Sequence, residues 1–239
     1  VAESVADLGF DYVNIDMQHG FSDYADVVDM MRAMVPAASS AAASTITCRV
    51  PWNEPGIIGR VLDAGAMGVI IPMVNTVEQA QAAVSACRFA PAGARSHGPI
   101  RAGRVNGPDY VATANERVAC IPMIETTEAI SNLDAILDVP GIDAVYVGPA
   151  DLSLTLGLPP AGDHDDESFN AALAAIVAAC DARNIVPGIH ANPGITQKRL
   201  DQGFRMVTLS SDLLSLASGA QANLAAARAG DGDAAGSMY

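Results

Sequence analysis

The chain is poor in basic residues and contains a single lysine, Lys198, among its 239 residues. Its 13 lysines and arginines face 27 acidic residues, which gives a formal net charge of −14. This charge repels a phosphate backbone, and the basic residues form no stripe along the chain. We therefore expect no nucleic-acid partner.

Two further absences concern cysteine pairs and long apolar runs. There is no Cys-x-x-Cys pair, and no apolar run reaches the roughly 18 residues that a membrane-spanning helix needs. The opening residues also lack a basic start followed by an apolar stretch. We therefore expect a cytoplasmic protein without membrane contact, in which the cysteines are free and buried; they are Cys48, Cys87, Cys120 and Cys180.

Short apolar, β-branched runs alternate with longer alanine-rich amphipathic stretches, which is the pattern of βα units around a parallel sheet. The predicted strands are Asp11–Asp16, Thr45–Val50, Gly68–Met73, Val118–Glu125, Ile142–Gly148, Val186–Ala191 and Met206–Ser211. The predicted helices are Ser22–Met34, Glu54–Ala64, Thr76–Cys87, Thr126–Leu137, Asp165–Arg183, Pro193–Gln202 and Leu213–Ala227. This alternation predicts an α/β fold of the (β/α)8 TIM-barrel class.

The barrel is expected to be one domain over residues 1–229, followed by a flexible tail at 230–239. The chain opens on a predicted helix, Val1–Leu8, so the first strand of the barrel is expected to be absent from this sequence. An incomplete barrel and a doubly wound open sheet are the alternatives, although no GxGxxG motif supports the open sheet. Pro36–Ser44 is predicted to be a linker, and Ala90–Gly107 a loop over the barrel mouth.

Polar side chains recur at the carboxyl ends of the predicted strands, where the catalytic groups of such barrels lie. They are Asp16, His19, Arg49, Glu125, Asp151, His190, Ser210 and Asp212. Glu125 and Asp151 follow neighbouring strands, and two carboxylates with open positions suit a divalent cation. The alternative is that each carboxylate only caps the helix or turn that follows it.

The segment Gly148-Pro149-Ala150-Asp151 favours anion binding, because proline has no N–H and the amides of Ala150 and Asp151 stay free at a helix start. A carboxylate held there can also meet the guanidinium of Arg49. The alternative for Arg49 is an ion pair with an acidic neighbour such as Asp16.

His19 follows Asp16 by three residues, close enough for the carboxylate to hold one imidazole nitrogen while the other acts as a base. The alternative is an ordinary loop histidine, and His190 is a second candidate. Lys198 is predicted on the polar face of an outer helix, which excludes a Schiff-base mechanism. A metal ion acting as Lewis acid then remains for stabilising an enolate.

The sequence resembles the class II, metal-dependent pyruvate aldolases typified by 4-hydroxy-2-oxoheptanedioate aldolase, which are related to the citrate lyase beta subunit. The resemblance covers nearly the whole chain. It rests on motifs in Phe10–Gly20, Cys48–Trp52, Leu62–Ala80, Pro91–Arg104, Ile121–Thr126 and Gly141–Ser153.

The resemblance implies a barrel of the phosphoenolpyruvate/pyruvate-domain type that reversibly cleaves 4-hydroxy-2-oxo acids to pyruvate or hydroxypyruvate and an aldehyde. It implies Mg²⁺, Mn²⁺ or Co²⁺ on Glu125 and Asp151, and proton handling by His19 with Asp16. Arg49 and the segment Gly148, Pro149, Ala150 and Asp151 would bind the substrate carboxylate. It also implies a homo-oligomer, a trimer or hexamer, with C-terminal helices packed between subunits.

The sequence departs from the family pattern at three positions: Gln18 replaces a usual glutamate, Met123 a frequent glutamine, and Ser96 a frequent glycine. Two related activities stay open, a coenzyme A thioester lyase and an oxaloacetate decarboxylase. The thioester lyase needs basic residues for nucleotide phosphates, for which the chain offers Arg95, Arg101 and Arg104. A non-catalytic barrel that binds carboxylates is the least favoured alternative.

Overall fold

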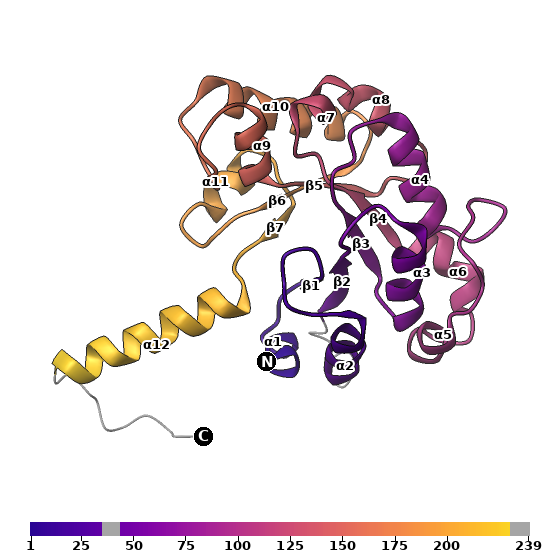
Figure 1. The fold of residues 1–239 in the computed structure, drawn as a ribbon, viewed down its shortest axis with the longest axis horizontal. Helices are drawn as coiled ribbons and strands as arrows, with labels where there is room; N and C mark the ends of the chain where they lie inside the picture. Colours follow the sequence, from indigo (N-terminus) through magenta and orange to yellow (C-terminus); the bar gives the residue numbers. More distant parts are fainter. Residues whose placement is uncertain (35–43, 230–239) are drawn as a thin grey trace.

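Every pair of neighbouring strands in the described residues is parallel, and the strands lie among helices (Figure 1). A computed structural model describes residues 1–34 and 44–229. Within them the strands are β1 (Tyr12–Asp16), β2 (Thr45–Arg49), β3 (Gly68–Ile71), β4 (Ala119–Pro122), β5 (Ala144–Val147), β6 (Val186–His190) and β7 (Met206–Thr208). The predicted parallel α/β class is confirmed.

The strands form two ladders, β1-β2-β3-β4 and β5-β6-β7, which meet between β4 and β5. Met123 and Tyr146 form a parallel bridge there, and the Ile124 amide donates to the Tyr146 carbonyl at 3.0 Å. At the other edges, the hydroxyl groups of Tyr12 in β1 and Thr208 in β7 are 2.8 Å apart. The curved sheet therefore brings side chains from the first and last strands together.

Helices lie outside the strands, and all of them except α12 cover the strands (Figure 1). They are α1 (Ala2–Ala6), α2 (Tyr24–Met34), α3 (Pro55–Ala64), α4 (Val77–Cys87), α5 (Ile100–Asn106), α6 (Tyr110–Arg117), α7 (Thr127–Ser131), α8 (Leu133–Leu137), α9 (Pro149–Thr155), α10 (Glu167–Asp181), α11 (Thr196–Asp201) and α12 (Asp212–Ala229). Local sequence sets several starts: Glu54 caps α3 through the amides of Gly56 and Ile57, and Thr76 with Gln79 forms a capping box on α4.

The buried side chains form two clusters. The larger cluster fills the space between strands and helices, and the smaller one lies inside the curved sheet. The inner cluster consists of Ile70, Ile121, Met123, Ala144 and Tyr146. The four cysteines are free and buried, as expected.

The predicted helix Thr126–Leu137 is two helices, because the chain turns at Asn132, which ends α7 and begins α8. The α6 helix was not predicted, and the expected loop Ala90–Gly107 contains α5. The end of β1 at Asp16 was predicted correctly, but the other strand ends were placed too late; β4 ends at Pro122, although the bridge at Met123 continues its direction.

The expectation that Ala90–Gly107 covers the barrel mouth is wrong. Arg95 is buried and pairs with Asp63 at 2.8 Å, and Arg101 donates to the carbonyl of Ala64. Both acceptors lie in the last turn of α3, and each outer helix runs back toward the end of the barrel where the strands begin. The arginines of this segment therefore join outer helices together.

The C-terminal helix α12 extends away from the strands (Figure 1). It has no buried residue, and Leu213, Leu214 and Leu216 are 67%, 57% and 70% exposed. Among the described residues, no helix combines the length and apolarity needed to cross a membrane. The predicted tail at 230–239 and most of the predicted linker, 35–43, lie outside the described residues.

Candidate active site

Asp16 and Arg49 end adjacent strands and are partners in the parallel register. Arg49 Nε donates to Asp16 Oδ1 at 2.9 Å, and Nη2 donates to Oδ2 at 2.5 Å. Burial by itself raises the pKa of Asp16, but the hydrogen bonds and charge of Arg49 lower it below its ordinary value. The ion pair that the sequence left open as an alternative is therefore present.

Glu125 is a buried carboxylate, with 1% of the residue exposed. Its Oε1 accepts a hydrogen bond from the Met73 amide at 2.8 Å. Its pKa is raised to about 7, chiefly by burial and also by the charge of Asp151, against the opposing effects of the Met73 amide and Arg49. Glu125, Asp151 and Arg49 are therefore close enough to influence one another electrostatically.

The structure does not support helix capping as the role of these two carboxylates. Thr126, not Glu125, caps α7 by accepting from the Ala129 amide at 3.0 Å. Asp151 lies inside α9, whose N-cap residue is Gly148. Neither carboxylate therefore has the capping role that the sequence allowed.

Gly148 brings the start of α9 against Glu125. A Cβ at Gly148 would overlap Glu125 Oε2 and lie 3.1 Å from Met123 Cε. Only glycine leaves room for the carboxylate at this position. The close approach also places the first turn of α9, with Ala150 and Asp151, beside Glu125.

This arrangement fits a divalent cation. Glu125 and Asp151 offer two hard oxygen donors, and a bound positive charge would offset the burial and the Asp151 charge that raise the pKa of Glu125. Within residues 1–34 and 44–229, no group of three or more His, Cys, Asp or Glu side chains is arranged to hold a metal. The protein would thus supply two ligands, and Mg²⁺ commonly takes its remaining ligands from water and substrate.

His19 lies in the exposed turn after β1. Asp16 contacts this turn through backbone amides: Gln18 donates to Oδ1 at 2.9 Å, and the His19 amide also stabilises the carboxylate. Both carboxylate oxygens are held by Arg49, so the expected Asp16 contact to the imidazole ring is replaced by contacts to Arg49 and to the turn.

From the sequence, His190 was only a second candidate for the base. Three hydroxyl side chains that contact His190 or one another were not predicted. Tyr146 is 4% exposed, and its hydroxyl is 2.5 Å from Thr208 Oγ1 and 3.4 Å from His190 Nδ1. The Tyr12 hydroxyl completes the group by its contact with Thr208. The signal was the period of two along each strand, which places these residues on the same face as Asp16 and Arg49.

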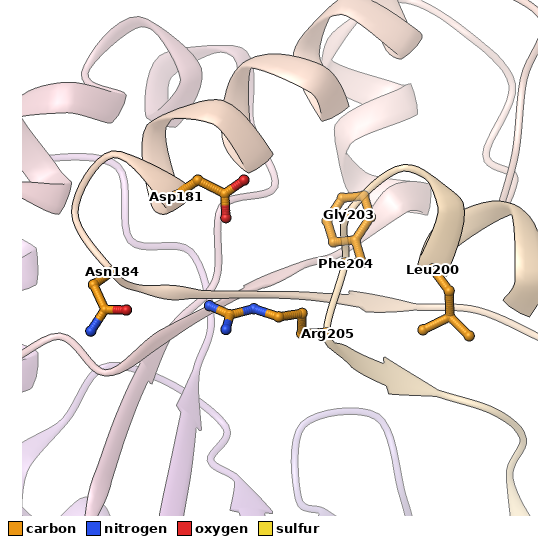
Figure 2. A pocket seen from close by; sticks show the side chains of 6 residues that line it. All are labelled: Asp181, Asn184, Leu200, Gly203, Phe204 and Arg205. Atoms are coloured by element: carbon orange, nitrogen blue, oxygen red, sulfur yellow. The ribbon is translucent and has the colours of Figure 1, made fainter.

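One cavity of about 500 Å³ lies at the other end of the strands (Figure 2). Its lining comes from the ends of α10 and α11 and the turns before β6 and β7, namely Asp181, Asn184, Leu200, Gly203, Phe204 and Arg205. In such barrels, this end contributes to the stability of the fold, whereas the catalytic groups lie at the opposite end. A second cavity, of about 320 Å³, includes Met73, whose amide contacts Glu125, and so lies on the side of the candidate active site.

Parallel strands covered by helices, with acidic and basic groups at the carboxyl ends of the strands, are typical of (β/α) barrel enzymes. The chain matches the family model described as HpcH/HpaI aldolase/citrate lyase over residues 1–219. It belongs to that family, and the resemblance predicted from the motifs is confirmed.

Individual relatives agree with this assignment. The chain is 40% identical over 229 residues to the hydroxypyruvate/pyruvate aldolase of Rhizorhabdus wittichii, covering 95% of this chain and 89% of that protein. It is 39% identical over 225 residues to the 4-hydroxy-2-oxo-heptane-1,7-dioate aldolase of Salmonella arizonae, covering 92% and 83%.

A solved structure supports the fold. A family member from Burkholderia cenocepacia J2315 aligns with a TM-score of 0.86 and 33% identity, covering 95% of this chain and 89% of that one. These likenesses confirm the barrel type of fold and show that the protein is an aldolase.

Proposed function

We propose that the protein cleaves 4-hydroxy-2-oxo acids reversibly to pyruvate, or hydroxypyruvate, and an aldehyde, with a divalent cation bound by Glu125 and Asp151. The observation that carries the proposal is the buried Glu125 carboxylate, which lies against α9 and within electrostatic reach of Asp151 and Arg49. The names of the two aldolases above support the same substrates.

In this proposal the cation is Mg²⁺, Mn²⁺ or Co²⁺, as the family resemblance implies; carboxylate oxygens suit Mg²⁺ and Mn²⁺ in particular. When bound, it supplies the positive charge that stabilises the enolate of pyruvate. The sole lysine is unavailable for the alternative imine route, because Lys198 lies in α11 and pairs with Asp163 at 2.6 Å.

Arg49 binds the carboxylate of the 2-oxo acid in this proposal, together with the amides of Ala150 and Asp151 at the start of α9. Asp16 holds the guanidinium by two parallel hydrogen bonds and so fixes its orientation. Gly148 and Pro149 shape this start, since glycine allows the approach to Glu125 and proline fixes the first residue of the helix.

His19, supported by the turn that Asp16 holds, exchanges protons between solvent and the methyl carbon of pyruvate. Its exposed position after β1 gives it access to water. Gln18 lies in the same turn, where its Oε1 is buried without a hydrogen-bond partner among the described residues. A carboxylate at that position would be costly to bury, which agrees with the neutral side chain here.

The test is removal and return of metal. A chelator should abolish both aldol cleavage and exchange of pyruvate methyl protons with D₂O, and Mg²⁺, Mn²⁺ or Co²⁺ should restore both. Glu125→Gln should lose the response to metal, whereas Glu116→Gln, an exposed carboxylate on α6, should keep it. Full activity of the metal-free protein would refute the proposal.

The structure disfavours the coenzyme A thioester lyase. Two of the three arginines available for nucleotide phosphates already have internal partners: Arg95 pairs with Asp63, and Arg101 with the ends of α2 and α3. Oxaloacetate decarboxylation needs the same carboxylates and the same enolate, and we propose it only as a side activity.

We also propose that the protein is a cytoplasmic homo-oligomer, a trimer or hexamer, in which α12 packs between subunits. The exposed leucines of α12, including Leu213 and Leu216, support this contact, because an exposed apolar patch commonly marks an interface. Light scattering should give the mass of a trimer or hexamer, and replacing both leucines by serine should lower it. A wild-type monomer would contradict the proposal.

A further inference from the structure

Four polar side chains, from β1, β5, β6 and β7, form a continuous series of contacts. His190 Nδ1 is 3.4 Å from the Tyr146 hydroxyl, which is 2.5 Å from Thr208 Oγ1. Thr208 Oγ1 is in turn 2.8 Å from the hydroxyl of Tyr12. This series of contacts therefore runs from the imidazole of His190 in β6 through β5 and β7 to Tyr12 in β1.

The strand register places these four side chains beside the candidate active site. Tyr146 is the register partner of Gly188, and His190 is the partner of Thr208. Because alternate residues of a strand share a face, Gly188 and His190 point to the same side as Tyr146 and Thr208. Burial lowers the pKa of His190 and raises that of Tyr146; the charge of Arg49 adds to the first shift and opposes the second, so the guanidinium lies near both groups.

We propose that His190 is a further catalytic residue, which accepts the proton of the substrate's C4 hydroxyl during aldol cleavage. This inference rests on the proposed function. As His190 takes the proton, the O–H electron pair forms the aldehyde carbonyl. The C3–C4 bond breaks, and its electron pair becomes the enolate of pyruvate. His190 then returns its proton to water, while the enolate carbon takes one from solvent by the separate route at His19.

The hydrogen-bond chain suits the imidazole for this task. When His190 Nδ1–H donates to Tyr146, Tyr146 donates to Thr208 and Thr208 to Tyr12, Nε2 keeps its lone pair and can accept a proton. Desolvation and the charge of Arg49 lower the pKa of His190, against the opposing charge of Asp16, which favours the neutral ring. Tyr146 is thus a positioning residue that acts through His190.

The two proton routes can be measured separately. In His190→Gln, cleavage of a 4-hydroxy-2-oxo acid should slow at least about tenfold in kcat, since loss of a general base typically costs 10²–10⁴-fold. Exchange of pyruvate methyl protons with D₂O, measured with Mg²⁺, needs no C4 hydroxyl and should change by less than about threefold. Cleavage at the wild-type rate, or equal slowing of cleavage and exchange, would overturn the proposal.

Two further variants sharpen the result. His97→Gln changes an exposed histidine that packs near Phe89, away from the chain of contacts, and should leave cleavage unchanged. Tyr146→Phe should slow cleavage less than His190→Gln, and the double variant should be no slower than His190→Gln alone, because Tyr146 acts only through the ring. Additive losses would contradict that coupling.

The outcome also separates this inference from the proposed function. A wild-type protein that shows neither metal-dependent exchange nor cleavage refutes the aldolase mechanism itself. If exchange and cleavage by the wild type both depend on metal, the variants test only the role of His190. Mg²⁺ affinity is the check on folding, because His190→Gln should retain it.

Discussion

Glu125→Gln should make the metal-free protein more stable while removing its metal site. The Glu125 carboxylate is buried, and burial raises its pKa from 4.5 to about 7. Ionising it in the folded protein is therefore disfavoured by about 3 kcal/mol relative to the unfolded chain. Glutamine keeps an oxygen that accepts from the Met73 amide but carries no charge.

The sign of this effect depends on pH. A carboxyl whose folded pKa lies above its unfolded value destabilises the fold once the pH exceeds the unfolded value, here 4.5, and the full cost is present above about 7. The variant should therefore match the wild type near pH 4.5 and exceed it by up to about 3 kcal/mol at pH 8. The gain should disappear when saturating metal stabilises the wild type.

The assay is urea unfolding of both proteins with a chelator at pH 5 and pH 8, followed by circular dichroism, together with calorimetric titration of Mn²⁺. Glu116→Gln, which changes an exposed carboxylate, serves as the control for charge alone. Equal free energies of unfolding for wild type and Glu125→Gln at pH 8 would refute the reasoning about burial. Wild-type Mn²⁺ affinity in Glu125→Gln would refute the assignment of the ligand.

Two other substitutions test the geometry. Gly148→Ala should destabilise the protein by about 1–3 kcal/mol and weaken Mn²⁺ binding, because the new methyl group overlaps Glu125 Oε2. Gly59→Ala, in α3 with no atom within 4 Å of the added Cβ, should be neutral or stabilising; equal unfolding curves for the two variants would contradict the contact. Arg49→Ala should raise the KM for pyruvate at least about tenfold, from the 1.5–3 kcal/mol typical of a charge-assisted hydrogen bond. Unchanged kinetics would reject a role in carboxylate binding.

Part of the site followed from strand order. Glu125 and Asp151 come after neighbouring strands, and parallel strands end on the same side of a sheet, so their approach was predictable. The ion pair of Asp16 with Arg49 was predictable only as an alternative, because both a pair and a substrate contact satisfy an arginine at a strand end. Choosing between them needs the register of β1 against β2.

The segment Ala90–Gly107 shows where local reasoning fails. Its glycines and arginines are typical of a surface loop, yet Arg95 is buried against Asp63 and Tyr110. The groups that accept hydrogen bonds from Arg95 and Arg101 belong to other helices, namely α2, α3 and α6. No local pattern contains that information.

The sequence by itself determined the alternation of strands and helices, the free cysteines, and the exclusion of an imine mechanism by the position of Lys198, because these depend on periodicity and residue type. Only the tertiary structure decided that Glu125 occupies the space where a side chain at Gly148 would lie. The same holds for the contacts that join Tyr12, Tyr146, Thr208 and His190. Those contacts join strands separated by up to 196 positions. Their distances are set by how the sheet curves, which is a property of all the packed strands together.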